Sequence, residues 1–380
     1  MSNFTSLHQS TGRKAGLLAA ALAAAAFARP TSAQSDETGN LRHGKVFVST
    51  NATTGNEVLV YARATGAAPT LLQRIATRGA GTGAALGSQG AVTLSRNGQH
   101  LFVVNAASNT LSTFSLSNGT MTLASVVDTG SQNPTSVTER DGLVYVLNAG
   151  GNGSVSGFTN ANGVLTPLAD GLRGLSQAGG TAPAQVSFNT YGDVLVITER
   201  ATSRLTSYSV LPNGTLARQA VTASPGATPF GFAFTANDTL LVTEAPGSSV
   251  SSYRFVDSSR LDAPRVVTAA LPDGQGAACW LAVTPNGRHA YAANAATSSI
   301  SSYAVGRDGR IALQASLAAS TGSNAGALDL SVTPDGQQLH VLAPRSHMVV
   351  SYAVTSTGGL SALGSVGTAI PDGAAGLAAN

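Results

Sequence analysis

Apolar and polar positions along this chain follow a unit that returns seven times. Each unit joins an apolar strand, a turn containing Asn-Gly or Asp-Gly, a second apolar strand and an aromatic marker. Successive markers lie 44 to 53 residues apart, and they fall at Tyr61, Phe114, Phe158, Tyr208, Tyr253, Tyr303 and Tyr352. A period of this length that consists only of short strands is typical of radially repeated sheets. The pattern therefore predicts an all-β, seven-bladed β-propeller.

The sixth unit displays the predicted blade most clearly. Residues 279–283 form an inner strand A, a Pro-Asn-Gly turn follows at 285–287, and residues 290–293 form strand B. Strand C covers 300–303, and an Asp-Gly turn leads to strand D near 311–317. Asn-Gly and Asp-Gly pairs supply the positive φ angles that two-residue hairpins need. Two such turns in each unit predict a four-stranded antiparallel blade.

The first and last units are incomplete in a complementary way. The chain enters the repeat at a B-type strand, residues 45–49, with no inner strand before it, whereas residues 373–380 resemble an inner strand with nothing after it. Six other inner strands are predicted at 92–94, 135–137, 184–188, 231–234, 280–283 and 328–332. We expect the C-terminal strand to pair into the first blade and close the ring, because closure removes exposed sheet edges.

A leader precedes the repeat. Arg13 and Lys14 are followed by an apolar run over 15–28 and by small residues that end at Ala33, the order typical of a secretory signal peptide. We therefore assign residues 1–33 to a signal peptide, 34–43 to an N-terminal linker and 44–380 to the propeller. The protein is expected to be exported, to the periplasm or as a secreted protein.

Charge and cysteine content narrow the partners. Without Arg13, Lys14 and Arg29 of the leader, 18 of the 21 Lys and Arg residues remain against 18 Asp and Glu residues. A neutral chain without a basic run gives no support for nucleic-acid binding. Cys279 is the single cysteine, so no intramolecular disulfide can form. We expect no membrane span, no cofactor and no metal site, and a monomer that takes a small-molecule ligand or a protein partner.

Candidate chemistry lies on the face formed by the B–C and D–A loops, since the A–B and C–D turns are short and uniform. Three units end strand B with Asn105, Asn148 and Asn294, residues expected to bond turn backbone. Glu199 and Glu244 replace this Asn in two adjacent units. If the two carboxylates approach each other, the pair suits acid–base work or cation binding. Alternatively, each accepts hydrogen bonds from loop amides or pairs with a neighbouring arginine.

Other candidates are spread over several units. Arg345 and His347 fall in the B–C loop of the seventh unit and could polarise a carbonyl and move a proton, or could be solvated loop residues. Arg200 follows Glu199 directly. Trp280 opens an inner strand, where it could form a binding platform or simply line the channel. Candidates for holding a ligand are Arg204 and, in the D–A loop after the third unit, Arg173.

The segment 278–303, ACWLAVTPNGRHAYAANAATSSISSY, resembles the lactonase-type seven-bladed propeller family, which is also described as 6-phosphogluconolactonase-like or carboxymuconate-cyclase-like and has YVTN-related repeats. The resemblance extends over about residues 44–380. It implies enzymes that open or close small lactones with His, Arg and Glu side chains at the channel mouth. Family enzymes commonly have a Pro-His pair before inner strands, whereas the residue after Pro134, Pro183 and Pro229 is not His here. Of the family's site residues, the resemblance therefore assigns only Glu199, Glu244 and Arg200 to positions in this chain.

Two functions remain open from the sequence. In the first, water activated by Glu199 or Glu244 attacks a lactone carbonyl, and an arginine stabilises the oxyanion; a related cycloisomerisation would use the same groups. In the second, the mouth binds a small molecule, a glycan or a protein without catalysis. A fold family alone does not decide between them.

Overall fold

The computed structural model describes residues 44–117, 120–255, 263–367 and 369–380. The predicted signal peptide and linker, residues 1–33 and 34–43, lie outside these residues, as does the Asn118-Gly119 turn. The described residues belong to one compact unit. In the described part of the chain, no helix is long and apolar enough to cross a membrane.

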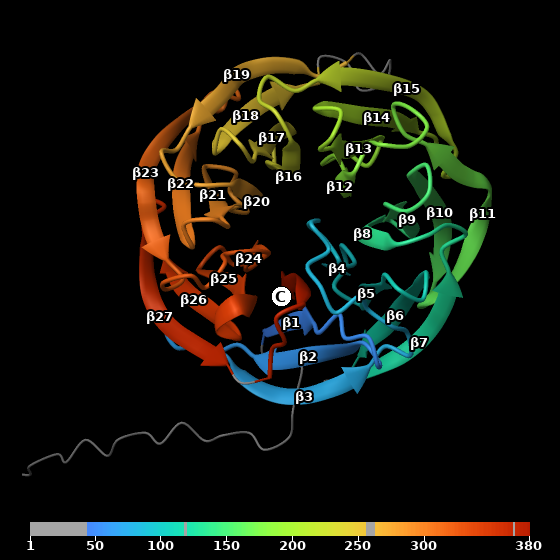
Figure 1. Cartoon of the computed structure of the whole chain (residues 1–380), viewed down its shortest axis with the longest axis horizontal. Coiled ribbons are helices and arrows are strands. Elements are labelled where there is room, and N and C mark those ends of the chain that lie inside the picture. Colours follow the sequence, from blue (N-terminus) through green and yellow to red (C-terminus); the bar gives the residue numbers. More distant parts are fainter. Residues whose placement is uncertain (1–43, 118–119, 256–262, 368) are drawn as a thin grey trace, which may run out of the picture. The chain divides into compact units, whose positions relative to one another are not determined.

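Seven four-stranded antiparallel sheets surround a central axis, as the repeat predicts (Figure 1). In each blade the inner strand is A and the outer strand is D. Blades 1 to 4 consist of β28 (Ala375–Ala379), β1 (Lys45–Ser49), β2 (Glu57–Ala62) and β3 (Thr70–Ala76); β4 (Val92–Leu94), β5 (His100–Asn105), β6 (Thr110–Ser117) and β7 (Thr120–Asp128); β8 (Pro134–Arg140), β9 (Leu143–Asn148), β10 (Ser154–Ala161) and β11 (Val164–Gly174); and β12 (Pro183–Phe188), β13 (Val194–Glu199), β14 (Arg204–Val210) and β15 (Leu216–Ala223).

The remaining three blades have the same order. They consist of β16 (Pro229–Phe234), β17 (Thr239–Glu244), β18 (Ser249–Arg254) and β19 (Arg265–Pro272); β20 (Ala278–Val283), β21 (His289–Asn294), β22 (Ser299–Val305) and β23 (Ile311–Ser320); and β24 (Leu330–Val332), β25 (Gln338–Ala343), β26 (Met348–Val354) and β27 (Leu360–Gly367). One short 3₁₀ turn, η2 (Pro344–Ser346), follows β25.

The ring closes through the C-terminal strand. β28 pairs antiparallel with β1, with Val46 opposite Ala379 and Val48 opposite Leu377, and in Figure 1 the red C-terminal strand lies beside the blue first strand. The predicted closure is therefore confirmed. It supplies the first blade with its inner strand from the far end of the chain.

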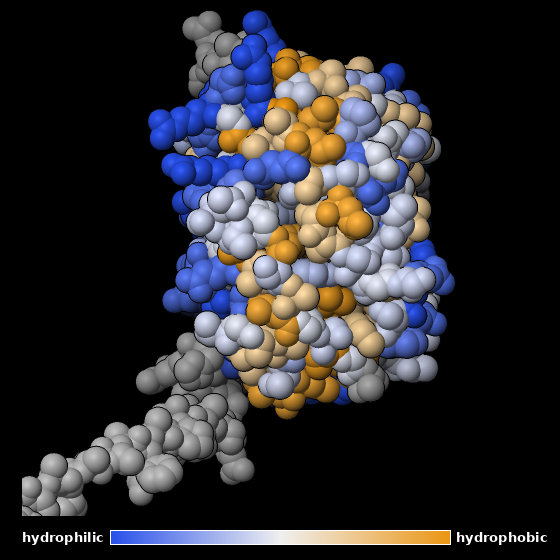
Figure 2. Space-filling view, turned by 90° about the vertical axis from the view of Figure 1, so that its left-hand side faces the viewer, coloured by the Kyte–Doolittle hydropathy of each residue, from blue (hydrophilic) through white to orange (hydrophobic). Residues whose placement is uncertain are grey.

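The core lies between neighbouring blades, where all seven aromatic markers are buried. Middle strands such as β13 and β17 are buried along their whole length, whereas the outer strands are exposed at many positions. Large apolar side chains remain exposed there, among them Leu313 and Leu317 of β23. Figure 2 looks onto the outer strands of blades 6 and 7 and shows apolar residues across the rim, with hydrophilic residues along both the left and the right edges of the view.

The turns differ in part from the expected two-residue hairpins. Asp141-Gly142 has two consecutive residues at positive φ, as a type I′ turn requires. At 286–287, however, only Gly287 has positive φ, its N–H donates to Thr284 O at 2.8 Å, and Asn286 Oδ1 accepts from Arg288 N at 3.0 Å. Here Pro285 enters a four-residue turn and Asn bonds its own backbone, so Gly alone takes the left-handed position.

Candidate functional site at the channel mouth

Glu199, the last residue of β13, has a fully buried side chain. Its Oε1 accepts from Ser176 N at 2.9 Å and from Thr206 Oγ1 at 2.6 Å, while its Oε2 accepts from Thr202 Oγ1 at 2.8 Å and from the Ser176 hydroxyl. Four donors compensate for the desolvation of the carboxylate. They also tie together the two loops at this end of blade 4.

Glu244, at the end of β17, is held in the same way. Its Oε1 accepts from Gly226 N at 3.0 Å and from the hydroxyls of Ser224 and Ser251 at 3.1 and 2.6 Å. Its Oε2 accepts from Ser249 Oγ at 2.6 Å. None of these donors is shared with Glu199. Each carboxylate is therefore bonded separately, by the loop that follows the preceding blade and by hydroxyls of its own blade, and no arginine is among these donors.

The Asn residues at the equivalent positions explain this arrangement. Asn105 Nδ2 donates to Ser112 Oγ at 2.8 Å and Asn294 Nδ2 donates to Ser301 Oγ at 2.8 Å, in each case to a hydroxyl seven residues further on. Glu199 and Glu244 use the hydroxyl at the same spacing, but they accept a hydrogen bond from it. Asn and Glu thus have the same structural role at this position, because each holds the B–C hairpin through that hydroxyl.

Arg200, the residue after Glu199, lies closer to the channel. Its Nε donates to Ala182 O at 3.0 Å and its Cζ lies 5.4 Å from the centre of the Phe230 ring, a cation–π contact. No hydrogen bond to its Nη atoms is found among the described residues. Phe230 in turn packs on Trp280, with ring centres 4.9 Å apart. A guanidinium with donors to spare therefore borders an aromatic pair at the mouth.

A segment from the first D–A loop covers this pair. We call residues 84–90 the mouth loop; Figure 1 shows the segment before β4 reaching toward the centre of the ring. Trp280 Nε1 donates to Ser88 O at 2.8 Å, and a Cβ on Gly87 would lie 3.0 Å from Arg200 Nη1. Gly87 also has a φ of +61°, so both backbone angle and space favour glycine.

The mouth loop bonds several blades. Its further hydrogen bonds include Ser88 Oγ to Thr135 O at 2.8 Å, Gln89 N to Ala184 O at 3.1 Å, Val137 N to Gly90 O at 2.9 Å, and a two-bond pair of the Gln89 amide with Leu281. Trp280 and Phe230 are consequently almost fully buried, with 6% and 5% of their surface exposed. Full use of the aromatic pair as a binding platform requires the mouth loop to move.

Cys279 lies in the same cluster. Burial raises the pKa of its thiol to about 12, although the nearby Arg200 charge acts in the opposite direction. A thiol is a strong nucleophile only as the thiolate. Cys279 is therefore a packing residue at neutral pH, as its place in an inner strand suggests.

The channel below the mouth loop contains a cavity of about 240 Å³. Polar groups line it, including Gln89, Thr138, Gln185, Ser187 and Asp329. Burial raises the pKa of the Asp329 carboxyl to about 7, against the hydrogen bonds it accepts from the backbone N–H groups of Gly376, Gly90 and its own residue. Perturbed carboxyls of this kind are common in functional sites. Sequence reasoning missed Asp329, although it is the one charge in an otherwise apolar run before β24.

Arg345 and His347 form a separate group on blade 7. Arg345, exposed in η2, donates from Nη1 to Asn324 Oδ1 at 3.3 Å. His347 Nδ1 lies 2.8 Å from Ile370 O, so this nitrogen carries the proton, and Nε2 lies 3.7 Å from Asp372 Oδ1. The two residues border the segment that leads into β28, and no contact joins them to Arg200.

Arg173 and Arg204 lie away from the mouth. The sequence analysis placed Arg173 in a D–A loop, and this placement is wrong. Arg173 lies in the outer strand β11, opposite Val155. β11 extends to Gly174, because its pairing with β10 resumes beyond the register shift between Ser156 and Phe158. Arg204 is the first residue of β14. It lies one strand further from the axis than the end of β13, which Arg200 follows. Among the described residues, no three His, Cys, Asp or Glu side chains are placed to hold a metal ion.

Comparison with known proteins agrees with this architecture. The family model described as "Lactonase, 7-bladed beta-propeller" matches residues 53–174 and 247–373, more than half of the chain. A comparison with curated protein sequences gives no match.

Several solved structures have the same fold. The periplasmic gluconolactonase of Pseudomonas aeruginosa is 17% identical with a TM-score of 0.67, over 88% of this chain and 98% of that chain. A proposed 6-phosphogluconolactonase of Bacteroides uniformis is 17% identical with a TM-score of 0.70, over 88% and 99%. A protein from Lactobacillus plantarum is 18% identical with a TM-score of 0.72, over 89% and 99%. At these identities the similarity establishes the fold.

Proposed function

Because the chain belongs to the lactonase family of seven-bladed β-propellers, we propose that it hydrolyses a small lactone at the channel mouth. The observation that carries this assignment is the Arg200 guanidinium, which borders the Phe230–Trp280 pair and retains donors on its Nη atoms. The fold it shares with a periplasmic gluconolactonase supports a sugar lactone as the first substrate to try.

The reaction adds water to the ring ester. The water oxygen bonds to the carbonyl carbon, negative charge develops on the carbonyl oxygen, and the ring C–O bond then breaks. The departing ring oxygen takes up a proton, water loses one, and the product is a hydroxy acid. Donors placed where the negative charge develops lower the barrier most, and Arg200 is the group at the mouth that can supply them.

Glu199 acts in this scheme by positioning Arg200. Its carboxylate fixes Ser176, Thr202 and Thr206, and so holds the turn that begins at Arg200. A direct role of Glu199 or Glu244 in activating water requires one of the bonded hydroxyls to turn away. Arg345 and His347 lie on blade 7, away from Arg200, and take no part in this scheme. In this scheme Trp280, Arg204 and Arg173 do not contact the lactone carbonyl.

The closed mouth favours a second candidate, a propeller that binds its ligand without catalysis. Both carboxylates are fully bonded, and the mouth loop covers the aromatic pair. Such a protein would bind a small molecule, a glycan or a protein partner. We propose export for either function, on the leader pattern in residues 1–33 and on the periplasmic location of one structural neighbour.

A panel of aliphatic, sugar and aromatic lactones, with gluconolactone among them, tests the assignment. Acid release is followed with a pH indicator, and the ring-opened hydroxy acid is identified by mass spectrometry. Enzymatic turnover above the spontaneous rate establishes the lactonase. If no member of the panel turns over but one of them raises the melting temperature, the binding protein is the correct description.

A further inference from the structure

The opposite face of the propeller has a cavity of its own, lined by the A–B turns of blades 5 and 6, the end of β18 and the C–D turn of blade 6. Its volume is about 570 Å³. Three arginines line it, Arg254 at the end of β18, Arg288 before β21 and Arg307 after β22, together with Asn237 and Asn286. We call it the arginine pocket. It is distinct from the mouth, because the A–B and C–D turns lie at the other end of every strand.

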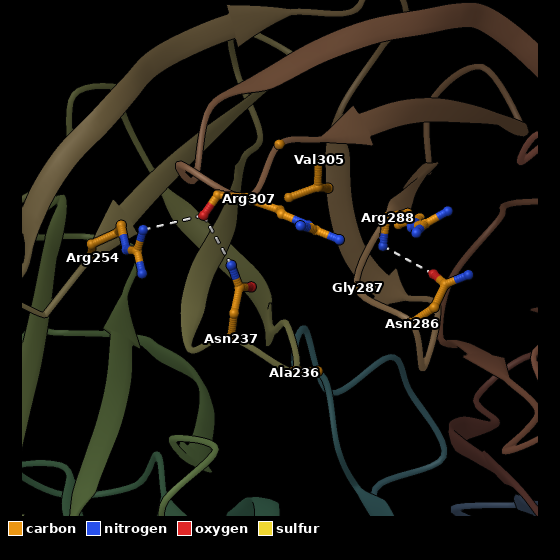
Figure 3. A pocket seen from close by; sticks show the side chains of 9 residues that line it. Ala236, Asn237, Arg254, Asn286, Gly287, Arg288, Val305 and Arg307 are labelled. Carbon is orange, nitrogen blue, oxygen red and sulfur yellow. Dashed lines mark hydrogen bonds between the residues drawn. The ribbon is translucent and has the colours of Figure 1, made fainter.

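The three guanidinium groups are presented by a fixed scaffold. Arg254 Nη1 and Asn237 Nδ2 both donate to the backbone oxygen of Arg307, at 3.3 and 3.2 Å, and this ties the C–D turn of blade 6 to blade 5. Figure 3 shows Arg307 between Arg254 and Arg288, with its side chain directed toward the turn that carries Arg288. The Arg254 stem packs on Gly309, where a Cβ would lie 3.1 Å from Arg254 Cδ.

The polar groups of the pocket are mostly donors. Asn286 Oδ1 accepts from Arg288 N at 3.0 Å and from Thr284 Oγ1 at 2.7 Å, so its oxygen is used and its amide nitrogen remains to donate. For the side chains of Arg288 and Arg307, no hydrogen bond or ion pair is found among the described residues. Three guanidinium groups therefore share one cavity.

The described carboxylates of the adjoining turns, Asp308 and Asp238, are engaged elsewhere. Asp308 accepts from Arg310 N and from Arg310 Nη1, both at 3.1 Å. Asp238 accepts from Thr190 N at 2.8 Å and from Asn189 Nδ2 at 3.2 Å, toward blade 4. No carboxylate is among the described residues that line the pocket. Like charges gathered without a counterion among the described lining residues repel each other, and an anion that binds between them removes that repulsion.

We infer that the arginine pocket binds a small oxyanion with at least two negative charges, such as a phosphate ester or a polycarboxylate. Arginine is suited to this task, because its planar fork donates two parallel bonds to phosphate or carboxylate oxygens. The cavity is deep enough for a small ligand, and its position on the turn face makes the site independent of lactone hydrolysis.

Isothermal titration calorimetry at low salt with inorganic pyrophosphate and citrate tests the inference. The full-length protein is compared with Arg288→Gln, Arg307→Gln and the matched control Arg310→Gln, which removes an arginine from the same turn that is paired with Asp308 and does not line the pocket. We expect each of the first two variants to weaken binding by roughly tenfold, the loss of one charge-assisted contact, and the control to bind as the parent does.

The outcomes separate the ligand classes. Tighter binding of pyrophosphate supports a phosphate ester, and tighter binding of citrate supports a polycarboxylate; in both cases added salt must weaken the affinity. Failure of the parent protein to bind either probe overturns the inference. So does an equal loss in Arg310→Gln, because binding would then reflect the general charge of this face. Melting temperatures of the three variants verify that each is folded.

Discussion

Gln89 and Leu281, which are 192 residues apart, are joined by two hydrogen bonds across the propeller axis. Gln89 Nε2 donates to Leu281 O at 2.8 Å, and Leu281 N donates to Gln89 Oε1 at 2.9 Å. The Gln89 amide thus acts as a short piece of strand and links the mouth loop of blade 2 to the inner strand of blade 6. It helps to close one end of the channel and to bury Trp280.

Gln89→Ala should loosen the mouth loop. The substitution leaves a backbone N–H and C=O of Leu281 without partners, at a cost of about 1–3 kcal/mol for each group that stays buried. We expect faster hydrogen exchange in residues 84–90 and in β20 (Ala278–Val283), measured by mass spectrometry.

Gln185→Ala is the matched control, since Gln185 makes the same two-bond pair with Phe232, at 3.0 and 2.7 Å, between blades 4 and 5. It should destabilise blades 4 and 5 while leaving the mouth loop protected. Unchanged exchange at 84–90 in Gln89→Ala would show that the pair does not hold the loop.

Closure of the ring gives a prediction about stability. Removal of residues 373–380 deletes β28 and exposes the edge of β1, so the melting temperature should fall sharply. A point variant separates packing from backbone strain. Gly376 has a φ of +85° and a Cβ there would lie 2.6 Å from Val92 N, whereas Gly66, with a φ of +74°, has nothing within 4 Å.

Gly376→Ala should therefore lower the melting temperature much more than Gly66→Ala, because both incur the strain of positive φ but only one also displaces β4. Equal decreases in the two variants would mean that β28 does not pack closely on its neighbours.

The Asp329 carboxyl predicts how stability depends on pH. Its pKa is raised to about 7 in the fold from an ordinary value of 3.8, so the unfolded chain releases this proton first as the pH rises. The contribution of Asp329 to stability is complete below pH 4 and is lost as the pH rises through 7. His340, whose pKa burial lowers to about 4, acts in the opposite direction, and comparison with a variant removes its effect.

Denaturant titrations of the parent protein and Asp329→Asn at pH 5 and pH 8 measure this contribution. The variant should gain stability relative to the parent between the two values. A constant difference would mean that Asp329 does not titrate in this range.

The fold was largely predictable from the sequence, but the side-chain environment of the mouth was not. Strand period, turn residues and aromatic markers are local signals, and they located the blades, the closing strand and the position of Glu199 and Glu244 at strand ends. The hydroxyls that bond these carboxylates come from loops and from strand C, and Gln89 and Leu281 belong to blades that lie far apart in the sequence. Such contacts depend on the relative placement of distant segments, and no spacing along the chain records them.

Glu199 and Glu244 give a test that separates structure from catalysis. In Glu199→Gln, the amide NH₂ group faces hydroxyl and N–H donors, so we expect a loss of unfolding free energy of about 1–3 kcal/mol, and the same for Glu244→Gln. Glu57→Gln is the control, because Glu57 is partly exposed and pairs with Arg74 at 3.4 Å. Loss of lactone turnover in either variant without any loss of stability would instead identify that carboxylate as part of the reaction.

The most direct measurement of the central claim is kcat/KM for the best lactone of the panel in Arg200→Gln, beside Arg204→Gln and the parent protein. Loss of one donor to a developing oxyanion typically lowers kcat by about 100- to 1000-fold. We predict a decrease of this size in Arg200→Gln, with a small decrease in melting temperature from loss of the Ala182 bond and the Phe230 contact, and activity close to that of the parent in Arg204→Gln. Full activity of Arg200→Gln would contradict the placement of the lactone carbonyl at the channel mouth.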